Sequence, residues 1–334
     1  MVRLRSVCLL RTSLAFIVAT FAAAVLRPLE AQDLSGQPIT IIVGRPAGGA
    51  TDAIARLVAQ RISESLHTQV DVANRPGDAA KPASSPGLPE FAAAPADGHT
   101  LLFMSTSTLI AQALHPDDPV DLTTLTPVTE VAAGPLVLTT RNSFPVNTLG
   151  DVIAYAKKDP HRLVFAAGGG MESTAYLAIE ALKAMAGIDV ALVAYKGGGP
   201  ALDKLLGGHI DLVLDAMAVI GPRAKADILK PLVVTSPQRS PALPDVPTMM
   251  ETGISDYAFV HWFGILAPAN TPPAIARRLR DEVAKALTSS DVLDELDRQG
   301  MRPLATEPEE WRAYLKSELE HYADVIKQAG IKPE

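Results

Sequence analysis

The chain has 334 residues, of which 48% are hydrophobic and 20% are charged, and its formal net charge is −7. A chain longer than about 250–300 residues is expected to divide its core between two lobes or domains. The acidic balance, with no basic stripe to offset it, argues against binding to nucleic acid or to anionic membranes.

The first 31 residues have the features of a secretory signal peptide. Three arginines within the first 11 residues precede an uncharged apolar run, Leu14 to Leu26. This run is shorter than the roughly 20 residues that a membrane-spanning helix needs. We therefore predict a signal peptide over residues 1–31, cleaved near Ala31, and export of the mature protein to the periplasm. An uncleaved N-terminal anchor is the alternative.

Removal of this segment changes the charge and the cysteine content. Residues 1–31 contain four arginines and one acid, Glu30, so the formal charge falls from −7 to about −10. Cys8, the only cysteine, is removed as well. The mature protein is therefore predicted to have no disulfide, no thiolate metal site and no cysteine nucleophile.

One unit recurs from Ile39 onward: a short apolar run, a turn rich in glycine or serine, and a segment with helical periodicity. The run Ile39–Val43 is predicted as a buried strand, and apolar residues at 3.6-residue spacing predict a helix that begins near Thr51. Near-continuous apolar strands that alternate with helices predict an α/β protein with a parallel sheet covered on both faces. The further predicted strands are Val70–Ala73, Thr100–Met104, Leu136–Thr139, Leu163–Ala166, Val190–Tyr195, Ile210–Leu214 and Leu232–Val234.

Helix-start signals and one loop complete the predicted elements. Segment Asp78–Pro89, rich in proline, glycine and serine, is predicted as an exposed loop. Thr148 with Asp151, and Thr306 with Glu309, resemble capping boxes at the starts of helices. After the second of these, one apolar stripe is predicted to pack into the core, and Gly330 to end the helix; the stripe consists of Trp311, Tyr314, Leu315, Leu319, Tyr322 and Ile326.

The sequence lacks the motifs of common exported enzymes. It has no Gly-x-Ser-x-Gly elbow, no Walker A loop and no Gly-x-Gly-x-x-Gly fingerprint. Its seven histidines show no metal-ligand spacing, and the acidic cluster Asp117, Asp118 and Asp121 lacks the glycine and the glutamate of a calcium loop. We therefore predict no cofactor, no metal and no catalytic activity. A Ser–His–Asp set that only folding assembles is the enzymatic alternative.

Three glycine-rich turns, residues 46–52, 168–174 and 196–200, lie between predicted strands and helices. A helix N-terminus leaves its first N–H groups without partners, and its dipole favours negative charge. Glycine lets those amides approach a ligand closely, so the turns suit a carboxylate or a phosphate. Alternatively, the glycines only form tight turns, and Thr51 and Asp52 cap their helix. The residues alone leave both interpretations open.

A series of short blocks along the chain carries a family resemblance. The blocks are Pro38–Val43, Pro46–Asp52, Asn74–Gly77, Asp97–Leu102, Thr126–Val128, Tyr195–Gly197, Arg239–Thr248, Trp262–Gly264, Ala267–Pro268 and Ala329–Glu334. In residues and in order they resemble the Bug-type receptors, the periplasmic substrate-binding proteins of tripartite tricarboxylate transporters. The resemblance extends over essentially the whole mature chain.

This resemblance implies a two-lobed periplasmic-binding-protein fold, with parallel-rich sheets flanked by helices and two crossing strands. Lobe one is then residues 32–137 plus 262–334, and lobe two is residues 138–261. The crossings are expected near Leu136–Thr140 and near His261–Leu266.

The resemblance also implies a ligand site in the cleft between the lobes, where backbone amides and ordered water hold a carboxylate. The expected ligand-binding residues of lobe one are Arg45, Ala47, Gly48, Gly49, Thr51, Ser105, Thr106 and Ser107. Those of lobe two are Gly168, Gly170, Ser173, Tyr195, Gly197 and Asp215.

Three departures from the family pattern concern the ligand. Arg45 stands where the family usually has an aromatic residue, and its guanidinium either contacts a second ligand carboxylate or points to solvent. Glu172 lies in a turn that is usually shorter, and Tyr176 replaces a common histidine. Facing the cleft, Glu172 would repel an anion or pair with an amine. Segment Asp78–Pro89 replaces a glycine-rich stretch beside the cleft.

These observations predict an extracytoplasmic receptor, acting as a monomer, for a small organic acid or amino acid. A dicarboxylate, an aromatic acid and an amino acid all fit. The partner would be the membrane subunits of a transporter or a sensor kinase, and not a nucleic acid. The alternatives are an exported hydrolase on a similar frame and a degenerate receptor that no longer binds a ligand.

Overall fold

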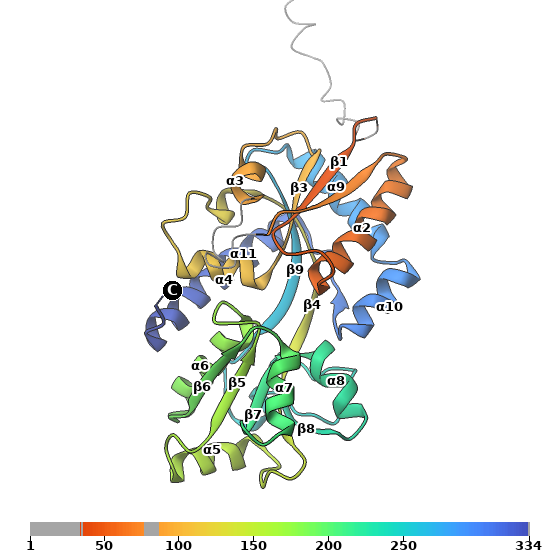
Figure 1. Ribbon diagram of the computed structural model, residues 1–334. Helices are drawn as coiled ribbons and strands as arrows, with labels where there is room; N and C mark the ends of the chain where they lie inside the picture. The colour runs from red at the N-terminus through yellow and green to blue at the C-terminus, as the bar shows by residue number, and fades with distance from the viewer. Residues whose placement is uncertain (1–33, 35, 77–86, 333–334) are drawn as a thin grey trace, which may run out of the picture.

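Two sheets, each covered by helices, lie one above the other; strand β4 runs through both, and the chain returns to the first sheet at the start of β9 (Figure 1). The structure, a computed structural model, describes residues 34, 36–76 and 87–332. The predicted signal peptide and most of the predicted loop Asp78–Pro89 lie outside the described residues. The described end of that loop, Gly87 to Pro89, begins a short helix.

The first sheet has the strand order β2-β1-β3-β9-β4, with β10 paired to β4. Strands β1, β2 and β3 are parallel, whereas β9 and β4 are antiparallel to their neighbours. The strands are β1 (Ile39–Val43), β2 (Val70–Asn74), β3 (Thr100–Ser105), β4 (Thr126–Arg141), β9 (Val260–Ala267) and β10 (Arg302–Pro303). The helices of this half are α2 (Ala50–Leu66), α3 (Gly87–Ala92), α4 (Thr106–Leu114), α9 (Pro273–Ala286), α10 (Ser290–Arg298) and α11 (Pro308–Ala329), with a 3₁₀ turn at Leu122–Thr124.

The second sheet continues from the far end of β4, which pairs with both β7 and β8. Its strands β5, β6 and β7 are parallel to one another. The strands are β5 (Val164–Gly168), β6 (Ala191–Tyr195), β7 (Leu212–Ala216) and β8 (Leu229–Val234), and the helices are α5 (Leu149–Lys158), α6 (Thr174–Ala186), α7 (Gly198–Leu206) and α8 (Met217–Lys225), with a 3₁₀ turn at Met250–Thr252.

Strand β4 changes partners part-way along its length. Up to Pro135 it pairs with β9 in the first sheet, and from Leu136 onward it pairs with β7 in the second. Strand β9 pairs in the first sheet along its whole length, so the second crossing lies at its start, where Phe259 donates its N–H to the Thr235 carbonyl at 3.2 Å. The predicted fold with two crossing strands is confirmed. The lobe limits at 137 and 261 remain a proposal.

The helix ends agree with the sequence signals in two places and differ in one. Thr148 and Asp151 form the predicted capping box at the start of α5, and Gly330 ends α11 in the left-handed conformation with φ 64°. The capping box predicted at Thr306 is wrong: α11 has Glu307 as its N-cap, without a side-chain hydrogen bond. The Thr306 hydroxyl instead accepts the Glu130 N–H of β4 at 3.0 Å.

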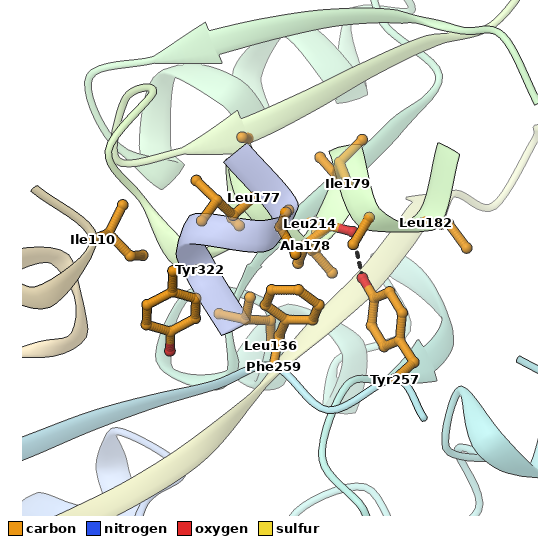
Figure 2. Packing of buried hydrophobic residues seen from close by; sticks show 14 of the residues in the cluster. Ile110, Leu136, Leu177, Ala178, Ile179, Leu182, Leu214, Tyr257, Phe259 and Tyr322 are labelled. Atoms are coloured by element: carbon orange, nitrogen blue, oxygen red, sulfur yellow. Dashed lines mark hydrogen bonds between the residues drawn. The ribbon is translucent and has the colours of Figure 1, made fainter. Parts of the chain in front are cut away.

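The core runs from one lobe into the other. Helices α2, α9 and α10 bury their apolar residues on one face of the first sheet, and α3, α4 and α11 bury theirs on the other. The predicted stripe on α11 packs against α4 and against α6 of the second lobe, and Tyr322 is 1% exposed there. Figure 2 shows this junction, where the Tyr257 hydroxyl donates to the Ala178 carbonyl at 2.6 Å.

No helix within the described ranges is long and apolar enough to cross a membrane. In the same residues, no group of three or more His, Cys, Asp or Glu side chains is placed to hold a metal ion.

Candidate ligand site between the lobes

The turn between β1 and α2 is built around the carboxylate of Asp52. The carboxylate accepts hydrogen bonds from the Gly48 N–H at 2.8 Å, from Arg56 Nε at 3.0 Å and from Asn74 Nδ2 at 2.9 Å. Burial alone would raise the pKa of Asp52, which is 4% exposed, but these three donors lower it below its ordinary value. Asp52 is therefore an ionised side chain that shapes the turn.

The backbone N–H groups that follow this turn are available to donate hydrogen bonds to a ligand. Gly48 has φ +85°, which favours glycine, and Gly49 is the N-cap of α2. Among the described residues, the N–H groups of Gly49, Ala50 and Thr51 have no hydrogen-bond partner. Ala47, also exposed, precedes them. The helix N-terminus is thus available to an anion.

The junction between β3 and α4, also in lobe one, contributes hydroxyl groups. The Ser105 and Ser107 hydroxyl oxygens are 3.0 Å apart, and the Arg45 guanidinium donates to the Ser107 oxygen. The Thr106 hydroxyl is fully buried and accepts the Trp262 N–H at 2.8 Å. The Thr106 side chain therefore holds β9 in place, which leaves its own N–H as the group it could offer to a ligand.

In lobe two, the Tyr195 carbonyl links the glycine-rich turn after β5 to the turn after β6. The N–H groups of Gly169 and Gly170 donate to the Tyr195 carbonyl at 2.9 and 2.8 Å. The Ser173 hydroxyl donates to the Gly170 carbonyl at 2.7 Å and accepts the Tyr176 N–H at 3.2 Å. Gly170, Ser173 and Tyr195 thus shape the turns through these atoms. The α6 amides of Thr174 and Ala175 have no partner among the described residues.

Asp215, at the end of β7, is enclosed between two glycines. A Cβ atom on Gly168 would lie 2.0 Å from Asp215 Oδ2, and one on Gly198 would lie 2.2 Å from it. Oδ1 accepts the Ala216 N–H at 2.7 Å, and Oδ2 has no hydrogen-bond partner within the described part of the chain. Burial raises the pKa of Asp215, which is 8% exposed, to about 6. A side chain at either glycine would displace this carboxyl group.

Charged groups from the two lobes lie close to one another. Glu172, in the turn before α6, lies 3.9 Å from His115 Nε2 at the end of α4. Arg45 is exposed as a residue, but protein atoms around its guanidinium lower its pKa, and the negative charge of Glu172 opposes this shift. Burial, and secondarily the Arg45 charge, lower the pKa of His261 on β9 to about 4. Arg45 therefore lies near β9 and within electrostatic reach of Glu172.

Comparison with known proteins identifies the family. The model of the tripartite tricarboxylate transporter family receptor matches residues 54–331. The chain belongs to this family. Its members are periplasmic solute-binding receptors. Protein BugT of Bordetella pertussis is 32% identical to this receptor over 326 residues, which cover 96% of this chain and 98% of BugT.

Solved structures of related proteins have the same fold. A TctC solute-binding protein from Polaromonas, without ligand, is 29% identical, with a TM-score of 0.78 over 88% of this receptor and 99% of that chain. The R. palustris protein Rpa4515, solved with adipate, is 31% identical, with a TM-score of 0.74 over 90% of this receptor and 100% of Rpa4515. MatC from Rhodopseudomonas palustris, with bound malate, is 29% identical, with a TM-score of 0.71 over 88% of this receptor and 100% of MatC.

The structure of this receptor places the predicted residues at the carboxyl ends of strands in both lobes. Arg45 to Thr51 and Ser105 to Ser107 lie at the carboxyl ends of β1 and β3, and the residues from lobe two lie at the ends of β5, β6 and β7. Sequence reasoning gave Asp52 only as a possible helix cap, without its bonds to Gly48, Arg56 and Asn74, and it missed the close approach of Gly198 to Asp215. The acid at the start of a helix could have indicated the first, but only the fold reveals the second.

Proposed function

We propose that this protein is a periplasmic receptor that binds a small carboxylate-bearing ligand between its two lobes. The observation that carries the proposal is that helix N-termini from both lobes, α2 and α4 against α6 and α7, present unpartnered amides to one interlobe edge. At that edge, Arg45 of lobe one lies within electrostatic reach of Glu172 of lobe two.

A carboxylate satisfies these amides better than a neutral ligand does. Hydrogen bonds to a charged group contribute about 1.5–3 kcal/mol each, roughly twice as much as bonds between neutral groups. The amides of Gly49 and Thr51 come from lobe one, and those of Thr174 and Ala175 come from lobe two. A single carboxylate bridging them would draw the lobes together, so binding is coupled to closure.

The position of Arg45 favours a second carboxylate on the ligand. Its guanidinium already contacts Ser107, and its planar fork suits a two-pronged contact with a carboxylate. Adipate and malate, found in two related structures, each carry two carboxylates. We therefore place a dicarboxylate first, ahead of an aromatic acid or an amino acid.

The same proposal covers the route of the protein and its partners. Residues 1–31 would be removed on export, near Ala31, and the mature receptor would act in the periplasm as a monomer without a cofactor. It would deliver its ligand to the membrane subunits of a tripartite transporter, or report it to a sensor kinase. Membrane-subunit genes beside its own gene would favour delivery.

A thermal-shift screen of the purified protein against some fifty organic acids and amino acids tests the proposal. A ligand at 100 times its dissociation constant stabilises the folded state by about 2.7 kcal/mol, which is easily visible. We expect dicarboxylates to give the largest shifts. Arg45→Ala should weaken dicarboxylate binding about tenfold or more and affect monocarboxylates less. Arg277→Ala, an exposed arginine on α9, is the matched control.

Either of two outcomes would contradict this function. The absence of a thermal shift with every compound of the panel would indicate a receptor that no longer binds a ligand. Hydrolytic turnover of an ester or amide by the purified protein would favour the exported hydrolase.

A further inference from the structure

A cavity lies beside β4 and β10, near the point where β4 passes from the first sheet to the second. Its volume is about 640 Å³, within the usual range for sites that hold small molecules. One wall comes from β4, β10 and α11, and the other from residues 236–242, which follow β8. None of the residues predicted to bind the carboxylate ligand lines this cavity.

A buried carboxyl group without a partner faces this cavity. Glu130 on β4 lines it and is 6% exposed, and no hydrogen bond reaches its carboxyl oxygens from any described residue. Burial, and secondarily the charge of Glu318, raise the pKa of Glu130 to about 8. The positive charge of Arg302 opposes this shift only in part.

Further acidic groups surround Glu130. Glu318 and Glu310, both on α11, also line the cavity, and both act to raise the pKa of Glu130. Glu318 accepts hydrogen bonds from the Tyr322 hydroxyl and from Trp262 Nε1, the latter at 3.4 Å. Burial nevertheless raises the pKa of Glu318 as well. Two carboxyl groups thus line one cavity, and no cationic side chain among the described residues donates a hydrogen bond to either of them.

The rest of the wall determines what kind of cation would fit. Ala133, Pro135, Val260, Met301 and Leu304 give the cavity an apolar surface beside these acids. Its other charged residues are Asp297, Arg302 and Arg239, and Arg239 pairs with Glu251 at 2.9 Å. A buried carboxylate is costly unless a cation pairs with it and donates hydrogen bonds. An ammonium group offers up to three donors, whereas no described cluster of side chains is arranged to hold a metal ion.

We propose that this cavity is a binding site for a small organic amine with an apolar stem, whose ammonium group pairs with Glu130 and Glu318. The stem would lie along the apolar wall between β4 and the segment 236–242. This site is separate from the interlobe carboxylate site, and its occupant differs in charge.

Calorimetric titration with 1,5-diaminopentane, compared with the neutral 1,5-pentanediol, tests the proposal. We expect the diamine to bind one to one at pH 7 and the diol not to bind. Glu130→Gln should weaken binding of the diamine at least tenfold while the protein keeps its fold and its thermal stability. Glu309→Gln, an exposed acid on the same helix as Glu318, should leave the binding unchanged.

Proton release provides a second readout. Glu130, facing Glu318, Glu310 and Tyr314 of α11 and Arg302 of β10, holds a proton at pH 7 in the empty cavity. An adjacent ammonium lowers the Glu130 pKa, so binding should release up to one proton, seen as a dependence of the heat on the buffer's ionisation enthalpy. At pH 9 the release should vanish, as it should in Glu130→Gln.

Three results would overturn the proposal. The first is no binding of the diamine at millimolar concentration, and the second is equal binding of the diol. The third is binding that survives Glu130→Gln but is lost in Glu172→Gln, which would place the diamine in the interlobe cleft.

Discussion

At the scale of single residues, Asp215 is a buried carboxyl group of the interlobe site that two glycines approach closely. Its Oδ2 atom has no hydrogen-bond partner among the described residues, and a Cβ atom on Gly168 or Gly198 would clash with it. A buried polar atom without a partner costs about 1–3 kcal/mol. A bound ligand or water that donates a hydrogen bond to Oδ2 would recover this energy, so a hydrogen-bond donor is favoured at this position.

The raised pKa of Asp215 makes stability depend on pH. It is about 6 in the folded protein and near 4 in an unfolded chain. Between these values the folded state binds the extra proton, so the contribution is full below about pH 4 and is lost as the pH rises through 6. Asp215→Asn removes the ionisation, and the ligand-free variant should be more stable than the wild type at pH 7 by about 2 kcal/mol.

Urea unfolding at pH 7 and at pH 4 measures this difference. The gain from Asp215→Asn should shrink towards zero at the lower pH. The exposed Asp117→Asn should show no such trend. A variant less stable than the wild type at pH 7 would contradict the assignment of an unfavourable buried charge.

At the scale of elements, helix starts differ in how firmly they are capped. The Thr148 hydroxyl accepts the Asp151 N–H at 3.1 Å, and the Asp151 carboxylate accepts the Thr148 N–H at 3.0 Å. Thr148→Ala should lower the free energy of unfolding by about 1 kcal/mol, because a helix N–H loses its acceptor. Ser289→Ala, at an N-cap without a side-chain hydrogen bond, should cost less. Equal losses in urea unfolding would rule out the capping explanation.

The strands that the sequence predicted are short apolar runs that stand out from their neighbours in the chain. Ile39–Val43 is a continuous apolar run and forms β1 with the predicted limits. The first half of β4 was missed, because Pro127, Glu130 and Pro135 break any apolar pattern there. Its extended conformation depends on pairing with β9 and β10, which lie far away in the sequence. Tertiary pairing of this kind overrides local preference.

The same distinction applies to the candidate site. The turns at the ends of β1 and β5 could be located from glycine and helix periodicity alone. Which of their atoms remain available could not, since the Gly48 N–H is taken by Asp52 and the Gly170 N–H by the Tyr195 carbonyl. These partners are chosen by the folded geometry and leave no trace in spacing or composition.

At the scale of the whole molecule, charge across the cleft sets the response to a ligand. Glu172 of lobe two lies near Arg45 and His115 of lobe one, where its negative charge opposes an entering anion. Glu172→Gln should therefore raise the affinity for the carboxylate found in the screen several-fold, most clearly at low salt. Calorimetry at two salt concentrations measures the effect.

A matched control for this prediction lies on helix α6, which follows the turn that contains Glu172. Glu180, on α6, pairs with Lys183 at 3.0 Å, and Glu180→Gln should leave the affinity for the ligand unchanged. Weaker binding by Glu172→Gln would instead indicate that Glu172 pairs with an amine on the ligand, as an amino acid would offer.

The pairing of β4 with β9 also bears on how such receptors can be recombined. The chain leaves the first sheet after Pro135 and returns at Val260, and these two residues are direct neighbours across the ladder. The intervening segment, residues 136–259, therefore begins and ends at neighbouring positions of the first sheet. Exchanging residues 136–259 for those of a relative would graft half of a foreign binding site onto this frame with only two adjacent splice points.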